Sequence, residues 1–127
     1  MKSLTPNIFV RDMARTLEWY RQLNFEVISQ VPEKGKDLIW ALIANDGVSL
    51  MLQTFDSLAS ELPMVSRSDG GSLILYITVA DVQQLFDNLP EKIHTLGTPE
   101  ISFYGAKEFS VVDPNNYVLT FAQLNVE

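Results

Sequence analysis

Residues able to perform nucleophilic, acid–base or metal chemistry are scarce in this chain. Its 127 residues include one histidine, His94, and no cysteine, which excludes a disulfide, a thiolate metal site and a cysteine nucleophile. Serine catalysis would need His94 beside a serine, and no strand–turn nucleophile motif is present. The Gly70-Gly71 pair lacks the glycine spacing and the lysine of a phosphate-binding loop. A structural role is therefore expected for His94, and no catalytic residue is identified.

Acidic side chains are the remaining chemical groups, and they are numerous. Neighbouring pairs such as Glu61 with Asp69, or Glu100 with Glu108, are predicted to be solvated surface charges. The formal net charge is −7 and the sequence holds no Lys/Arg cluster, so neither a nucleic acid nor an anionic membrane is an expected partner. This acidity is compatible with a cationic small-molecule ligand, and equally with a role in solubility alone.

Nothing in the sequence predicts a membrane segment or a secretion signal. No apolar run approaches the roughly 20 residues that cross a bilayer. The first residues, Met1-Lys2-Ser3-Leu4, lack the apolar core of a signal peptide. A cytoplasmic location is the resulting expectation.

Two similar stretches of sequence supply the elements that must position any site. Asp12 separates a predicted strand over residues 7–10 from a predicted helix over 13–23. Asp81 follows a second predicted strand, over 73–79, and precedes a second helix. Each aspartate is a good helix N-cap because its carboxylate can accept hydrogen bonds from the first free amides. The repetition predicts two half-domains built on one plan.

Each predicted helix leads into an antiparallel hairpin. The first hairpin spans 38–52 around Asn45-Asp46-Gly47, and the second spans 108–122 around Asp113-Pro114-Asn115-Asn116. Asp-Gly between apolar runs favours a tight turn because glycine adopts positive φ without strain. The predicted organisation is a single domain over 1–127, with module one at about 1–65, a linker at about 66–71 and module two at about 72–127.

The order of these motifs resembles the vicinal oxygen chelate superfamily, and within it the metal-free branch of bleomycin-resistance proteins. The superfamily also includes glyoxalase I, extradiol dioxygenases and fosfomycin resistance enzymes. Two of its usual glycines are Asn24 and Asn116 here, and asparagine is the next-best residue for positive φ. The resemblance implies an α+β fold, in which two βαβββ modules form a curved mixed sheet with a concave cleft, and a homodimer. It is carried by Pro6–Asp12, Thr16–Arg21, Leu23–Phe25, Tyr104–Phe109 and Asp113–Tyr117.

In the metal-dependent branches, the resemblance implies four His, Glu or Gln ligands on the concave face. The corresponding positions hold Thr5, Ser49 with Met51 nearby, Ile74 and Thr120. A divalent metal needs several imidazole or carboxylate donors converging on one point. No metal or other cofactor is therefore expected, and neither is a reaction that depends on a metal-activated oxygen.

Strand alternation, with Thr5 placed inward as the resemblance implies, gives the residues that would line the cleft. They are apolar, aromatic or neutral polar, which is the usual composition of a small-molecule site. A shift of one residue would exchange the two faces of a strand, so a core position is the alternative for Phe9, Met51 and Trp40. The predicted ligand-binding residues are Asn7, Phe9, Trp40, Ser49, Met51, Gln53, Tyr76, Tyr104, Phe109 and Thr120.

The function favoured by these observations is metal-independent binding or sequestration of a small aromatic or cationic molecule, as in bleomycin-resistance proteins. Aromatic side chains would contribute stacking and cation–π contacts. Two alternatives stay open. One is a metal-dependent lyase, isomerase or dioxygenase of the glyoxalase type, with ligands not recognised in the sequence. The other is a dimeric interaction module that binds no small molecule.

Overall fold

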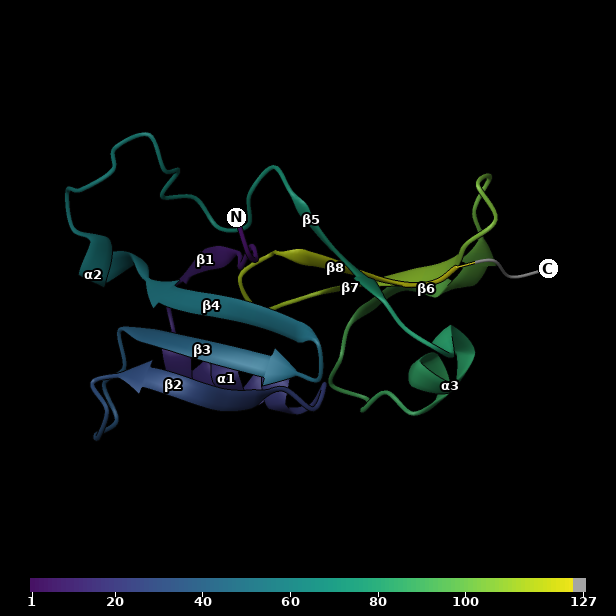
Figure 1. Ribbon diagram of the computed structural model, residues 1–127, viewed down its shortest axis with the longest axis horizontal. Coiled ribbons are helices and arrows are strands. Elements are labelled where there is room, and N and C mark those ends of the chain that lie inside the picture. Colours follow the sequence, from purple (N-terminus) through teal and green to yellow (C-terminus); the bar gives the residue numbers. More distant parts are fainter. Residues whose placement is uncertain (125–127) are drawn as a thin grey trace. The chain divides into compact units, whose positions relative to one another are not determined.

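The computed structural model describes residues 1–124, which divide into two compact units. The first unit is Met1–Asp69, and the second begins at Gly70. Each unit contains one four-stranded mixed sheet and a helix that follows its first strand (Figure 1). The prediction of an α+β fold made of two βαβββ modules is confirmed. No helix among the described residues is long and apolar enough to span a membrane.

In the first unit the strands are arranged in the order β1-β4-β3-β2, with β1 parallel to β4 and the other pairs antiparallel. The apolar face of α1 supplies the core, with Leu17 and Tyr20 almost fully buried. Alternate strand residues such as Ile8, Leu50 and Leu52 are buried as well, as expected for a sheet with one covered face. The elements are β1 (Asn7–Val10), α1 (Met13–Arg21), β2 (Glu26–Val31), β3 (Trp40–Asn45), β4 (Val48–Thr54) and α2 (Phe55–Leu58).

The second unit repeats this arrangement, in the order β5-β8-β7-β6 with β5 parallel to β8. Its core contains Phe109, whose ring lies 5.2 Å from that of Phe86 on α3 and 5.4 Å from that of Phe121 on β8. The β6–β7 pair contains a register shift between Leu96 and Glu100. The elements are β5 (Ile74–Thr78), α3 (Val82–Asp87), β6 (Thr95–Ile101), β7 (Lys107–Val112) and β8 (Val118–Gln123).

The predicted helix starts are correct, whereas the first helix ends earlier than predicted. The carboxylate of Asp12 accepts from the amide of Arg15 at 3.0 Å, and that of Asp81 accepts from the amide of Gln84 at 3.0 Å. The helix predicted over 13–23 stops at Arg21 because a turn follows, in which Asn24 has a φ of 64°. Polar caps are local signals, whereas the last helical residue depends on how the following chain folds back.

Asparagine replaces glycine at two turns, as the sequence predicts. Asn24 and Asn116 both have positive φ, at 64° and 65°. The final turn is organised by the buried carboxylate of Asp113, which accepts from the amides of Asn115 at 2.7 Å and Tyr117 at 2.9 Å. Gly70 packs against this turn so closely that a Cβ there would lie 2.8 Å from the carbonyl oxygen of Asn116.

One arginine organises the irregular segment that follows α2. The guanidinium of Arg67 donates to backbone carbonyl oxygens at distances of 2.5 to 3.1 Å. Arg11 holds the same segment to the end of β1, because it pairs with Asp69 at 2.7 Å and donates to the carbonyl of Arg67 at 2.7 Å. The carbonyls that Arg67 contacts belong to Ala59, Glu61, Leu62 and Val65.

Replacing Arg67 by alanine is expected to destabilise the first unit by about 1–3 kcal/mol, because several backbone acceptors lose a charged donor. Both tryptophans, Trp19 and Trp40, lie in this unit, so the urea dependence of tryptophan fluorescence measures its free energy of unfolding. Arg15→Ala is the matched control, since Arg15 is exposed on α1. Equal stability of the two variants would contradict the assigned role of Arg67.

Candidate functional site

The first sheet collects six of the predicted binding residues on the face that points away from α1. In the parallel β1–β4 pair, Asn7 lies opposite Met51 and Phe9 opposite Gln53. In the antiparallel β3–β4 pair, Trp40 also lies opposite Gln53. The residues between them along each strand are the buried ones that face the helix. The strand register thus gathers Asn7, Phe9, Trp40, Ser49, Met51 and Gln53.

Neutral amides and hydroxyls form a short hydrogen-bonded chain on this face. The side-chain amide of Asn7 donates to the Oε1 of Gln53 at 2.9 Å, and the amide of Gln53 donates to Ser57 Oγ at 3.2 Å. Ser57 Oγ donates in turn to the carbonyl of Thr54 at 2.8 Å. These bonds fix the orientation of the Gln53 amide beside Trp40 and Phe9.

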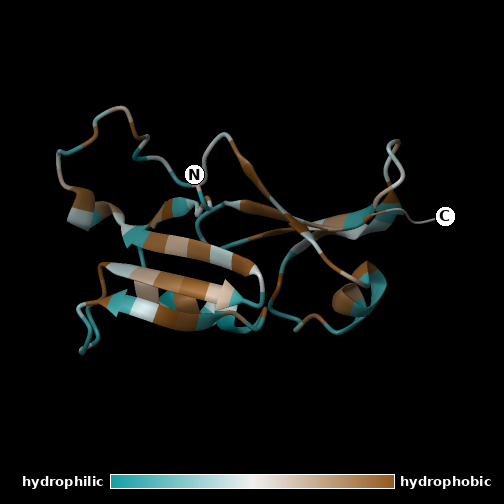
Figure 2. Cartoon of the chain, viewed as in Figure 1, coloured by the Kyte–Doolittle hydropathy of each residue, from teal (hydrophilic) through white to brown (hydrophobic). Residues whose placement is uncertain are grey.

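The same face is apolar where a solvated sheet would be polar. Phe9, Trp40, Leu42 and Met51 are half-buried on it, and Figure 2 shows β3 and β4 as largely hydrophobic bands. An antiparallel pair with one solvated face normally alternates apolar and polar residues. In β3 and β4, apolar residues therefore occur on the helix-facing side and also on the opposite side. This indicates that the face away from α1 is suited to being covered.

In the second sheet, the face away from α3 carries a hydroxyl pair. The strand register places Tyr76, Thr120 and Ser110 side by side on neighbouring strands. Thr120 is buried, and its hydroxyl lies 2.8 Å from that of Ser110. Tyr76 is 47% exposed, so its ring is available on this face.

Glu108, on the same face, is held by two phenols. The Tyr76 hydroxyl donates to its Oε2 at 2.9 Å. The Tyr104 hydroxyl, from the loop between β6 and β7, lies 2.8 Å and 2.7 Å from its two oxygens. That loop is itself fixed, because the amide of Ala106 donates to Ser102 Oγ at 3.1 Å. The carboxylate therefore has a defined position although its surroundings are open.

This cluster alters the acidity of one phenol. Although about half of Tyr76 is exposed, desolvation of its hydroxyl raises the pKa of Tyr76 above its ordinary value. Hydrogen bonds with Tyr104 and Glu108 act in the same direction, as does the negative charge of Glu108. A phenolate at this position would face a carboxylate, so the neutral phenol is favoured.

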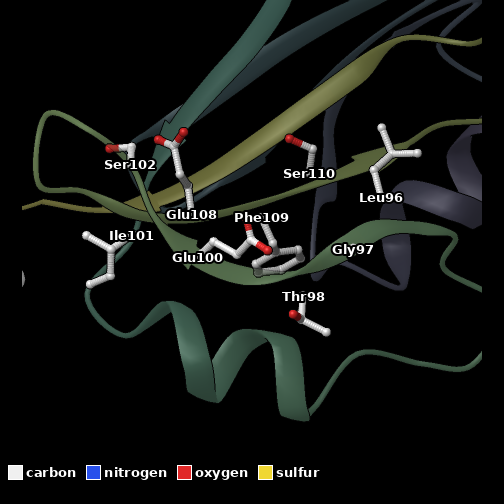
Figure 3. A pocket seen from close by; sticks show the side chains of 9 residues that line it. All are labelled: Leu96, Gly97, Thr98, Glu100, Ile101, Ser102, Glu108, Phe109 and Ser110. Carbon is white, nitrogen blue, oxygen red and sulfur yellow. The ribbon is translucent and has the colours of Figure 1, made fainter.

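A cavity of about 240 Å³ opens between β6 and β7, next to Glu108 (Figure 3). It occurs where the register shift between Leu96 and Glu100 separates the two strands. Its walls combine apolar side chains, hydroxyls and carboxylates. They include Leu96, Glu100, Ile101, Ser102, Glu108 and Ser110.

One predicted binding residue belongs to the core. Phe109 was predicted to be a ligand-binding residue, but its side chain lies in the core of the second unit. The residue lies inside β7, is 3% exposed, and packs between Phe86 and Phe121. It also lines the cavity, but from the α3 side of the sheet. Glu108, one position earlier, points to the opposite face because strand residues alternate.

Glu108 was missed by the sequence analysis, which grouped it with Glu100 as a solvated surface charge. The two are cross-strand partners in the β6–β7 pair. The sequence offered one signal, because Glu108 and Ser110 are two residues apart and therefore share one face of a strand. Their proximity to Tyr76 and Tyr104 depends on pairings between distant parts of the sequence, which no local pattern reveals.

The residues at the four positions of the family's metal ligands do not fit a metal. Thr5 and Ser49 offer only hydroxyls, and Ile74 is a hydrocarbon that is 61% exposed. The hydroxyl of Thr120 is engaged by Ser110. Within residues 1–124, no three His, Cys, Asp or Glu side chains gather in a way that could hold a metal ion. His94 is exposed, and its carbonyl accepts from the amide of Val112 at 3.2 Å.

The fold and this sequence define a known class. Residues 3–121 match the model of the Glyoxalase/Bleomycin resistance protein/Dioxygenase superfamily, and the chain belongs to that family, which confirms the predicted resemblance. No curated protein matches the sequence.

Solved structures with the same fold share little sequence with this chain. A bleomycin-binding protein complexed with bleomycin has 18% identity and a TM-score of 0.65, over 97% of this chain and 98% of its own. A bleomycin resistance determinant encoded on transposon Tn5 has 19% identity and a TM-score of 0.66, over 99% and 100%. A glyoxalase/bleomycin resistance protein/dioxygenase from Nocardioides has 14% identity and a TM-score of 0.78, over 98% and 84%. At these identities the likeness shows the fold alone.

The phenol of Tyr76 is expected to remain protonated at a pH where an ordinary tyrosine, with a pKa of about 10, has ionised. Ultraviolet phenolate absorbance, compared between the wild type and Tyr76→Phe, isolates this group. Glu108→Gln should move the titration of Tyr76 to lower pH, because the substitution removes the neighbouring negative charge. Glu91→Gln should not change the titration of Tyr76. Ionisation of Tyr76 at the pH of an ordinary tyrosine would contradict the cluster.

The core position of Phe109 can be tested against an exposed phenylalanine in the same unit. Phe109→Ala is expected to lower the free energy of unfolding by about 3–5 kcal/mol, since it leaves a cavity between two rings. Phe103→Ala should change it by less than about 0.5 kcal/mol, because Phe103 is 100% exposed. Denaturant titration followed by circular dichroism compares the two, and similar losses would place Phe109 outside the core.

Proposed function

We propose that the protein binds a small aromatic or cationic molecule without a metal, in the manner of the bleomycin-binding members of its family. The observation that carries this proposal is the half-buried apolar face of the first sheet, formed around Phe9, Trp40 and Met51. Free energy is gained when a planar molecule removes a hydrophobic surface of this kind from water.

The polar groups on this face suit an organic ligand. The Asn7–Gln53 pair presents neutral donors and acceptors whose direction is fixed by hydrogen bonds. Small-molecule sites usually have a mainly apolar wall with a few oriented polar groups. Met51 adds an adaptable, polarisable contact for an aromatic ring.

The charge of the chain supports a cationic ligand. With a formal net charge of −7, the protein raises the local concentration of positive solutes near its surface. A solved structure with this fold is a bleomycin-binding protein complexed with bleomycin, which supports sequestration as the type of activity. A role in antibiotic resistance is part of the proposal.

The organisation predicted from the sequence completes the proposal. The active form is a homodimer in the cytoplasm, and each chain acts as one domain with a linker at about 66–71. Nine of the ten residues predicted from the sequence remain the candidate ligand contacts, and the tenth, Phe109, lies in the core.

A thermal-shift experiment with bleomycin and ethidium, each in the presence of EDTA, tests the proposal. A ligand that binds only the folded protein stabilises it by about 2.7 kcal/mol at a concentration of 100 times its Kd. We therefore expect a concentration-dependent rise in Tm with at least one of these aromatic cations. Stabilisation that requires added zinc or manganese would favour the metal-dependent enzyme, and absence of any shift would remove support for sequestration.

Matched methionine variants locate the binding surface. Met51→Lys places a positive charge on the proposed face and should abolish the ligand-induced rise in Tm, because it repels a cation and disrupts stacking. Met64→Lys serves as the control, since Met64 is exposed in the segment after α2. Equal ligand responses of the two variants would place the binding surface elsewhere.

A further inference from the structure

The chain that follows β4 lies beside the proposed binding face, and we call its residues 59–69 the strap. α2 begins directly after β4 with Phe55, which is buried. The Phe55 ring lies 5.8 Å from the ring of Phe9, which belongs to the uncovered face of the first sheet. Ser57 of α2 accepts from the side-chain amide of Gln53 on the same face at 3.2 Å. α2 therefore lies against one end of this face, and the strap continues from it (Figure 1).

The strap exposes its apolar side chains and is strained at two positions. Leu62 and Met64 are 52% and 79% exposed, so their burial contributes little to holding it in place. Ala59 and Leu62 have positive φ, at 51° and 48°, which residues with a Cβ rarely adopt. Such a backbone persists only where the surrounding structure imposes it. The conformation of the strap therefore depends on the groups that hold it to the rest of the first unit.

Arg11 connects the strap to the binding face. It follows β1, two residues after Phe9. Its guanidinium carbon lies 4.9 Å from the centroid of the Phe55 ring. The same guanidinium pairs with Asp69 at 2.7 Å and donates to the carbonyl of Arg67 at 2.7 Å. A continuous series of contacts thus runs from Phe9 through Phe55 and Arg11 to the strap.

The contacts in this series are individually weak, which suits a segment that opens and closes. The side chains of Arg11 and Asp69 are 58% and 40% exposed, and an exposed ion pair contributes little to stability. A cation–π contact at an exposed site is also modest. Together, a few such contacts change the ratio of closed to open strap by about tenfold. They hold the strap closed most of the time without fixing it permanently.

We infer that the strap is a gate for the first-sheet face, closed while Phe55 contacts both Phe9 and Arg11 and open when these contacts are lost. The inference rests on the proposed function, because it describes how binding at that same site is regulated. A ligand that stacks on Phe9 supports the Phe55 ring and so stabilises the closed strap. By linkage, the open strap binds the same ligand more weakly.

Amide hydrogen exchange of the full chain, measured by NMR without any ligand, tests the coupling between face and strap. The amides of Glu61 and Val65 report on the closed strap, because they donate to the carbonyls of Leu58 and Leu62 at 3.0 and 2.9 Å. Opening of the strap breaks these bonds and speeds exchange at both positions. The hydrogen-bonded amides of the β3–β4 pair serve as the reference for unfolding of the whole sheet.

Three single variants separate the coupling from a general loss of stability. Arg11→Gln is expected to speed exchange of the two strap amides about tenfold relative to the β3–β4 reference. Phe9→Leu changes the face and not the strap, and it should speed the same amides about threefold. Arg15→Ala, at an exposed position on α1, should leave them unchanged. Unchanged strap exchange in Phe9→Leu, or an equal acceleration in the β3–β4 pair, would overturn the inference.

The double variant Phe9→Leu with Arg11→Gln tests whether both residues act through Phe55. Residues that share a partner have non-additive effects, whereas independent sites add in free energy. We therefore expect the double variant to speed strap exchange by less than the product of the two single effects. A full product would mean that face and strap are independent, and the inference would be wrong.

Ligand binding distinguishes a failure of this inference from a failure of the proposed function. If ethidium or bleomycin raises the Tm, it should also slow exchange of the strap amides, and Arg11→Gln should weaken its binding about threefold or more through faster dissociation. A rise in Tm with unchanged strap exchange would overturn the inference and leave the proposed function standing. If neither compound raises the Tm, the proposed function loses support, and strap exchange in Phe9→Leu still decides the coupling.

Discussion

The parallel pairing of the first and last strands within each module determines which side chains meet on its uncovered face. In the first module β1 lies in register with β4, so that Asn7 and Phe9 stand beside Met51 and Gln53. In the second module β5 lies in register with β8, so that Tyr76 stands beside Thr120. Because strand side chains alternate, a shift of one residue in either pair would exchange core and surface along the shifted strand.

This constraint explains how much of the site could be predicted from the sequence. The Asp12 and Asp81 caps and the positive φ of Asn24 and Asn116 depend on a few adjacent residues, so local patterns were enough to find them. Strand alternation also predicted which residues of the first sheet share the face away from the helix. The family resemblance fixed the starting point, because it placed Thr5 on that face.

What the sequence could not supply were the features that depend on pairings between distant segments. The burial of Phe109 was missed because the pairing of β7 with β6 and β8 decides which face each of its residues occupies. Glu108 looked like a surface acid for the same reason, since its phenol partners come from β5 and from the β6–β7 loop. The four acceptors of Arg67 likewise carry no local sequence signature.

The two modules share a plan but differ in the chemistry of their uncovered faces. The first face is neutral, with amides between aromatic and thioether side chains. The second places a carboxylate between two phenols. The duplicated scaffold thus carries two chemically different faces.

The bonds of Arg67 have a consequence for local dynamics. The segment between α2 and the second unit has neither helix nor strand over most of its length, and several of its carbonyl groups share a single donor side chain. The hydrogen bonds that order this segment are therefore not independent of one another. When the guanidinium leaves, all of these acceptors are released together, so the segment opens as one cooperative unit of local unfolding.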